Sequence, residues 1–89
     1  MNKEDLIKEC LRIRNKYSNN IPLDDKDKNW MLEEIFKHHP NWNKRDNKPI
    51  KDVIIKNDWT LHNNRSFYIV YDDNSCDHIA FRWCILNKK

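Results

Sequence analysis

The N-terminal part of the chain places its apolar residues at helical spacing. Between Asn2 and about Tyr17, hydrophobic side chains recur every three or four positions, which gathers them on one face of an α-helix. Asn2 can cap the first turn, and the negative charge of Asp5 suits the positive end of a helix. We therefore expect a first helix over this stretch, within an additional N-terminal segment of residues 1–20.

A second helical pattern follows the connector "IPLDD". Asp24 or Asp25 can cap its start, and an apolar face then continues to about His38. Pro40 ends the pattern, because a proline disfavours helical backbone at the residue before it. The sequence thus predicts a second helix that ends just before Pro40.

From Ile50 onward the pattern changes to the alternation that is typical of β-strands. Three runs fit it, namely "IKDVIIKNDWT", "SFYIVYD" and "DHIAFRWCIL". The stretch "DDNS" joins the last two as a hairpin turn. Since the chain contains no glycine, Asn74 is the candidate for the left-handed position of that turn.

Successive side chains of a strand point to opposite faces, so the third run should divide into two sets. The inward set, packed against Trp30 and Ile35, is Ile79, Phe81, Trp83 and Ile85, and the outward set is His78, Ala80, Arg82 and Cys84. The predicted fold class is α+β, with two helices packed on one face of a three-stranded antiparallel sheet. A length of 89 residues suits one domain, residues 1–89.

No run of the sequence is apolar enough to act as a targeting or membrane segment. A membrane-spanning helix needs about 20 consecutive apolar residues, and no stretch approaches this. The first residues carry acids where a signal peptide would be apolar. We expect a cytoplasmic protein with no membrane partner.

The net charge of +3 is concentrated in the middle of the chain. Acids and bases balance before Pro40 and again after Arg65, and between them cations interleave with aromatic residues. Such a combination can grip a phosphate backbone and stack on unpaired bases. The candidate nucleic-acid-binding residues are Trp42, Lys44, Arg45, Lys48, Lys51, Lys56, His62, Arg65 and Arg82. The alternatives are a solvated loop with tryptophans in the core and, for Arg82, an ion pair with Asp72.

The cysteines and histidines do not follow the spacing of a reactive site. Cys76 and His78 share a strand face about 7 Å apart, but Cys84 lies about 26 Å along a continuous strand. There is neither a CxxC nor a pair of histidines at zinc-binding spacing. Cys84 is also expected in an apolar strand, where thiols are inert. We predict reduced cysteines, no metal, no cofactor, no catalytic residues and no enzyme activity.

Several motifs follow one another between Leu32 and Ile85. "HHP" ends the second helix, a β-branched strand and His62 come next, and "NRSFYIVYDDNSCDHIAFRWCI" then continues without a gap. In this order they resemble the DCL family ("defective chloroplasts and leaves"), a module of which also lies at the C-terminal end of the largest subunit of plant RNA polymerase V. The residues that match its pattern are Arg65, Phe67, Val70, Asp73, Ser75, Arg82, Cys84 and Ile85.

The chain departs from that family pattern at five positions. Ser66 replaces a cysteine, Asn74 a glycine, Tyr71 an arginine, His78 an aspartate and Trp83 a basic residue. The resemblance implies ribosomal RNA processing and association with RNA-producing machinery, and it implies no catalytic residues. The two basic residues that are missing weaken the RNA contact that it implies for this segment.

Two functions of different classes follow from these patterns. The first is a small non-enzymatic nucleic-acid-binding module, with RNA favoured and a role linked to RNA processing or transcription. The second is a protein-interaction module, such as a viral or phage adaptor or inhibitor docking on a host machine. The expected partners are accordingly RNA or a protein of the RNA machinery. The salt dependence of binding distinguishes these two functions, because phosphate binding weakens steeply as the salt concentration rises and binding through an apolar protein interface does not.

Overall fold

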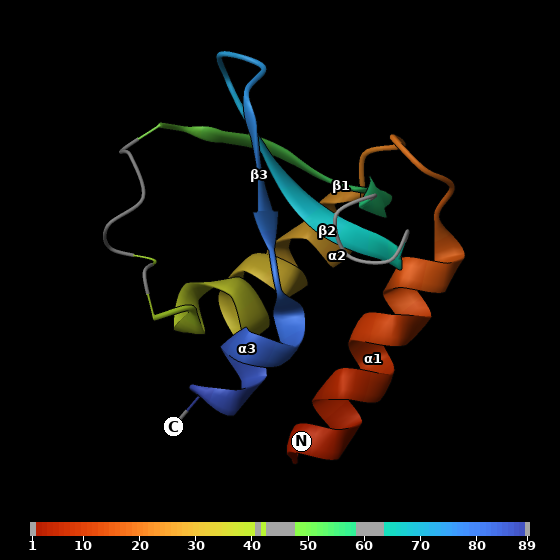
Figure 1. Cartoon of the computed structure of the whole chain (residues 1–89), viewed down its shortest axis with the longest axis vertical. Helices are drawn as coiled ribbons and strands as arrows, with labels where there is room; N and C mark the ends of the chain where they lie inside the picture. Colours follow the sequence, from red (N-terminus) through yellow and green to blue (C-terminus); the bar gives the residue numbers. More distant parts are fainter. Residues whose placement is uncertain (1, 41, 43–47, 59–63, 89) are drawn as a thin grey trace.

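The computed structural model describes residues 2–40, 42, 48–58 and 64–88. Its elements are α1 (Lys3–Lys16), α2 (Asp25–Trp30), the π-helical turn η1 (Met31–Ile35), the 3₁₀ turn η2 (Phe36–His38), β1 (Ile50–Asp58), β2 (Asn64–Tyr71), β3 (Cys76–Ile79) and α3 (Phe81–Leu86). The helices gather on one side of the sheet (Figure 1). The predicted α+β class, with helices on a three-stranded antiparallel sheet, is confirmed.

Helix α1 forms as its sequence pattern predicts. The side chain of Asn2 accepts a hydrogen bond from the amide of Asp5 at 2.8 Å, which satisfies one of the free N–H groups of the first turn. Leu6, Cys10 and Ile13 are buried at helical spacing and form the face that meets the core. The helix therefore begins with the predicted cap and buries the predicted stripe.

The second helical segment begins at α2 and runs through η1 and η2. Asp24 caps it by accepting a hydrogen bond from the amide of Asp27 at 2.8 Å. Ile35 and Phe36 are fully buried, and Trp30 is half-buried against the core. The segment ends at His39, whose extended backbone precedes Pro40.

The sheet order is β1-β2-β3, and both pairings are antiparallel. Val53 pairs with Ile69, and Ile55 pairs with Phe67, which in turn pairs with Ile79. All five of these side chains are buried, so they form the face that meets the helices. Because strand side chains alternate, the neighbouring positions lie on the outer face of the sheet.

The turn between β2 and β3 uses asparagine in place of glycine. Asn74 has a φ of 68°, in the left-handed region, as the sequence predicts. The Asp73 carboxylate accepts hydrogen bonds from the amide and the hydroxyl of Ser75. These bonds and the Lys48 ammonium lower the pKa of Asp73 to about 2. Asp73 thus has a structural role in the turn.

The prediction of a long third strand is wrong. β3 ends at Ile79, and the chain turns at Ala80 into α3. Phe81, Cys84 and Ile85 are its buried residues, and they recur at helical spacing. Trp83, predicted in the core, is 52% exposed, and Cys84, predicted to face outward, is fully buried. A third helix therefore covers the core in place of a strand extension.

Candidate functional site: an arginine-lined hollow

Three arginines from separate elements line one hollow of about 410 Å³. Arg14 comes from the last turn of α1, Arg65 from the start of β2 and Arg82 from the first turn of α3. The apolar walls of this hollow are Phe67, Ile79 and Phe81, and the other lining residues are Ser66, His78 and Ala80. We call this site the arginine hollow.

The hollow exists because β3 stops early. The β2–β3 ladder ends where Phe67 pairs with Ile79, and a longer strand would have placed Ala80 opposite Ser66. The turn into α3 instead directs the chain toward α1, with which α3 is in contact. The space beside the start of β2 thus stays open, at the point where the sequence had predicted continuous sheet.

Arg65 is held in place by the connector that follows α1. Its Nε donates a hydrogen bond to Asn19 Oδ1 at 2.9 Å, and its Nη2 donates to the carbonyl oxygen of Tyr17. A guanidinium has five N–H donors, so three remain for other partners. The side chain is therefore oriented without losing its capacity to bind an anion.

Arg14 lies partly buried beside it. Its Nη1 donates to the carbonyl oxygen of Arg65 at 3.5 Å, whereas its Nε is buried without an acceptor among the described residues. Burial, followed by the positive charges of Arg82 and Arg65, lowers the pKa of Arg14. The positive charges of Arg65 and Arg82 thus both act on the guanidinium group of Arg14.

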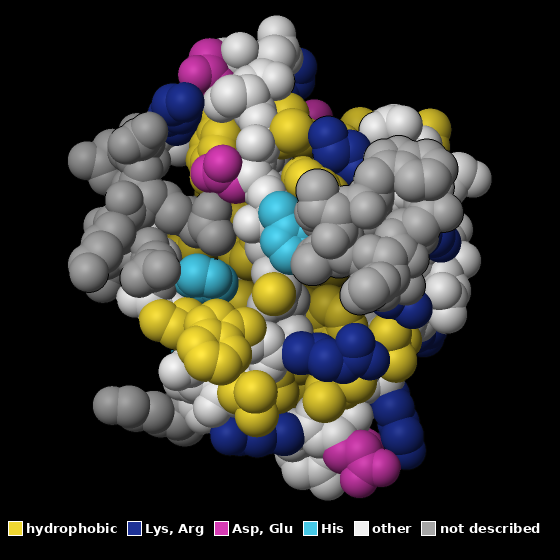
Figure 2. All heavy atoms as spheres, in the orientation of Figure 1, with side chains coloured by type: hydrophobic (Ala, Val, Ile, Leu, Met, Phe, Trp, Pro, Cys, Tyr) yellow, Lys and Arg dark blue, Asp and Glu magenta, His cyan; other side chains and the backbone are white. Residues whose placement is uncertain are grey.

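Arg82 is exposed, and its guanidinium carbon lies 5.0 Å from the centre of the Phe81 ring. Figure 2 shows Lys/Arg side chains over a hydrophobic area in the region where Figure 1 places α3. Among the described residues, no carboxylate forms an ion pair with Arg14, Arg65 or Arg82. The alternative pairing of Arg82 with Asp72 is therefore not formed, and the hollow has a local excess of positive charge.

The predicted lysines that the structure describes lie just before and along β1 and do not line the hollow. Lys48 pairs with Asp73 at 3.1 Å, and Lys51 donates to Asn74 Oδ1 at 3.4 Å, so both are at the turn. Lys56 lies over the ring of Tyr68, 4.5 Å from its centre. The turn is about 13 Å from the hollow, four residues further along β2. The structure thus brings together Arg65 and Arg82 but not the three lysines.

The outer face of the sheet carries a row that leads toward the hollow. Ile54 pairs with Tyr68, which pairs with His78 on the next strand. The rings of Tyr68 and His78 meet edge to face at 5.4 Å. His78 also lines the arginine hollow. A basic and aromatic surface, with Lys56 beside it, is therefore continuous with the arginines.

The remaining predicted residues do not contribute to this site as it is described. Trp42 is half-buried against the core, which agrees with the alternative of a core tryptophan. Lys44, Arg45 and His62 lie outside the described residues.

Sequence reasoning missed Arg14. Charges before Pro40 balance, so the net charge of that segment gives no sign of this arginine. A signal was present in the helical pattern, because Arg14 follows buried Ile13 and lies four residues after buried Cys10. A cation at the edge of a buried stripe is placed where α1 meets the rest of the fold.

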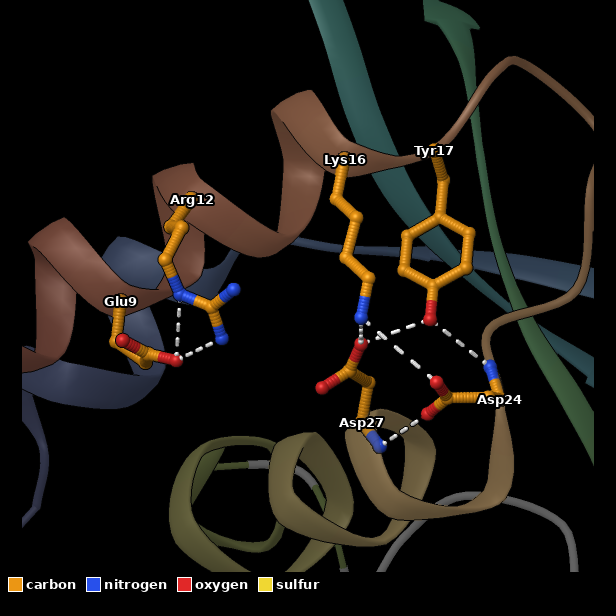
Figure 3. Close-up of polar contacts among 6 residues, drawn as sticks. All are labelled: Glu9, Arg12, Lys16, Tyr17, Asp24 and Asp27. Carbon is orange, nitrogen blue, oxygen red and sulfur yellow. Dashed lines mark hydrogen bonds and ion pairs between the residues drawn. The ribbon is translucent and has the colours of Figure 1, made fainter.

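A polar cluster supports the connector that holds Arg65 (Figure 3). Lys16 and Tyr17 both point at Asp27, to which the Tyr17 hydroxyl donates at 2.7 Å and the Lys16 ammonium at 3.0 Å. The same hydroxyl accepts from the amide of Asp24 at 3.1 Å. Burial opposes ionisation of Asp27, but the hydrogen bonds from Tyr17 and Lys16 outweigh it and lower the pKa. This cluster fixes Tyr17, whose carbonyl accepts from Arg65.

The cysteines are free, and they lie in two environments. Cys10 and Cys84 are fully buried, and Cys76 is exposed. Burial raises the pKa of the Cys10 thiol to about 12, so this group stays protonated and inert. Among the described residues, no three His, Cys, Asp or Glu side chains are grouped to hold a metal ion.

Comparison with solved structures shows the fold. The chain is similar to an uncharacterised protein of Rhodospirillum rubrum whose structure was solved by NMR in solution, with a TM-score of 0.76 and 18% identity over 92% of this chain and 76% of that one. No curated protein matches the sequence. No described helix has the length and apolar character to cross a membrane.

The predicted membership of the DCL family is wrong, because the family model that matches is a different one. It covers residues 11–85, which includes the C-terminal part of α1 and extends well beyond the predicted region of resemblance. Nothing in these comparisons indicates the DCL family. The chain belongs to DUF3223, a family described as a protein of unknown function.

Proposed function

We propose that this chain is a non-enzymatic nucleic-acid-binding module whose ligand is single-stranded RNA. The observation that carries the proposal is the arginine hollow, where three guanidinium groups converge with no carboxylate paired to them among the described residues. Arginine donates to phosphate oxygens in a fork, so a cluster of this kind favours phosphate binding. RNA stays the predicted ligand, and a cytoplasmic location stays a prediction with it.

The outer face of the sheet supports a single-stranded ligand. Tyr68 and His78 lie on it beside Lys56, and this row reaches the hollow. Flat rings can stack on unpaired bases while nearby cations bind the backbone. A duplex buries its bases and offers only phosphates and groove edges, so we expect single strands to bind more tightly.

Binding to fluorescent single-stranded RNA, duplex RNA and DNA, measured across a salt series, tests this proposal. Wild-type affinity should fall steeply with salt, and Arg82→Ala should weaken binding and lower the salt slope by about one ion. Lys8→Ala is the matched control, because Lys8 is exposed on α1 and pairs with Glu4. Lys48→Ala should have a smaller effect than Arg82→Ala, since Asp73 already pairs with this lysine. The absence of RNA binding at low salt would contradict the proposal.

One observation favours the alternative of a protein-interaction module. Trp83 and Leu86 lie one turn apart on α3 and are 52% and 64% exposed. Exposed large apolar side chains on one helix are characteristic of protein interfaces. In the same salt series a mainly apolar interface would show little change, so a ligand captured equally at low and high salt would favour this alternative.

A further inference from the structure

We propose that the arginine hollow takes a terminal phosphate of the RNA chain, a phosphomonoester, and not an internal phosphodiester. This inference rests on the proposed RNA binding and specifies which part of the ligand enters the site. The partially enclosed form of the hollow, its charge and its position at the end of the outer face all point to a chain end.

The charge of the site suits a dianion. Arg14, Arg65 and Arg82 bring three positive charges into one hollow of about 410 Å³. An internal phosphodiester carries one negative charge, whereas a phosphomonoester carries about −1.5 to −2 at neutral pH and three acceptor oxygens. The monoester therefore neutralises more of the repulsion among the guanidinium groups and can accept from more of their N–H donors.

The shape of the site favours a chain end as well. The hollow is bounded by α1, by the start of β2 and by the junction of β3 with α3, and Phe67, Ile79 and Phe81 form its apolar walls. A terminal group enters such a space from one direction. An internal phosphate would require the nucleic acid to enter and leave by separate paths past these three elements.

The outer face offers a path for the rest of the chain. His78 lines the hollow and is paired with Tyr68, and Lys56 lies over the Tyr68 ring. With the terminal phosphate in the hollow, the following bases would reach the row formed by Ile54, Tyr68 and His78. The arginines then select the phosphorylated chain end, and the row adds the same affinity whether or not that end carries a phosphate.

The test compares three forms of one short RNA sequence, which carry a 5′-phosphate, a 3′-phosphate or hydroxyls at both ends. The hydroxyl form at raised concentration also serves as the competitor. Phosphate at one end should tighten binding about tenfold relative to the hydroxyl form, and the two phosphorylated arms identify which end is bound. Arg82→Ala should abolish the preference for phosphorylated over hydroxyl RNA. Because Arg82 is exposed, the variant should fold, and Arg82→Lys should restore part of this preference through its charge.

Lys56→Ala is the matched control, since this residue lies on the outer face and not in the hollow. It should weaken all the RNAs by the same factor and leave the end preference unchanged. Equal affinity of wild type for phosphorylated and hydroxyl RNA would overturn the inference and leave the proposed function standing. Failure of every RNA to bind would overturn both. A phosphoserine peptide that binds as tightly as phosphorylated RNA would assign the hollow to a protein ligand and overturn the inference too.

Discussion

Substitution of Asp27 by asparagine should destabilise the fold through the cluster that holds Tyr17. The carboxylate is 8% exposed and accepts from the Tyr17 hydroxyl at 2.7 Å and the Lys16 ammonium at 3.0 Å. A hydrogen bond to a charged group contributes about 1.5–3 kcal/mol, whereas the ion pair with Lys16 adds little, because this side chain is half-exposed and its charge is screened by water. Since the asparagine carbonyl can still accept from Tyr17, we expect Asp27→Asn to lower the free energy of unfolding by about 1–3 kcal/mol.

The pH dependence of this difference gives a second, independent test. The pKa of Asp27 is lowered below its ordinary value of 3.8 in the folded state, so the carboxylate stabilises the fold above that value. This stability is lost as pH falls through the folded pKa. The difference in free energy of unfolding between wild type and Asp27→Asn should therefore be largest near neutral pH and should shrink as pH falls below about 4.

Urea unfolding followed by tryptophan fluorescence measures both effects. Asp25→Asn is the matched control, because it removes the same charge from the same helical turn but at a side chain that is 93% exposed. The control should change stability by less than about 0.5 kcal/mol. Equal effects of the two substitutions, or a gap that widens as pH falls, would refute the assignment of Asp27 as the buried centre of the cluster.

Three further predictions follow from the turn, the cysteines and α3. At about pH 8 a thiol reagent should modify Cys76 quickly and spare Cys10 and Cys84 until the protein unfolds; rapid modification of all three would contradict their burial. Asn74→Ala should lower the free energy of unfolding by about 1–2 kcal/mol, because φ is 68°, whereas Asn74→Gly should not, and equal urea midpoints for the two would be inconsistent with the left-handed turn. Trp83→Gln should cost less than about 1 kcal/mol in urea unfolding, since the side chain is 52% exposed, and a cost above about 3 kcal/mol would place it in the core.

Signals from nearby residues were sufficient to predict the helix starts in the N-terminal half and the turn between β2 and β3. Asn2 and Asp24 both cap helices, and Asn74 adopts the left-handed conformation, because each of these features depends on residues within a few positions in the sequence. The buried face of α1 also follows its helical spacing, whereas the second segment changes from α-helix to a π-helical and a 3₁₀ turn, which its sequence pattern did not predict.

The prediction of a long third strand failed because the sequence pattern fits both a strand and a helix. Ile79, Phe81 and Ile85 satisfy strand alternation, but Phe81, Cys84 and Ile85 satisfy helical spacing equally well. Packing of α3 against α1 decides between them, and this contact joins residues far apart in the sequence. The arginine hollow follows from that turn, so the sequence pattern could place Arg14 at the edge of the buried face of α1 but could not bring it together with Arg65 and Arg82.

The lysines show a second limit of sequence reasoning. Lys48 and Lys51 count as basic residues in the composition, but the hairpin register brings Asp73 and Asn74 to them. Charge along the chain therefore overestimated the cations available to a ligand at the turn and underestimated those near α1.

RNA binding at the arginine hollow is tested most directly by an NMR titration with single-stranded RNA that follows the arginine Nε–H signals together with the backbone N–H signals. We predict that the largest shifts occur for Arg14, Arg65 and Arg82, the three side chains of the arginine hollow. These shifts should saturate together, because one phosphate would contact all three. Largest changes at the Lys48 turn or around Trp83, with the three arginine signals unmoved, would contradict the account.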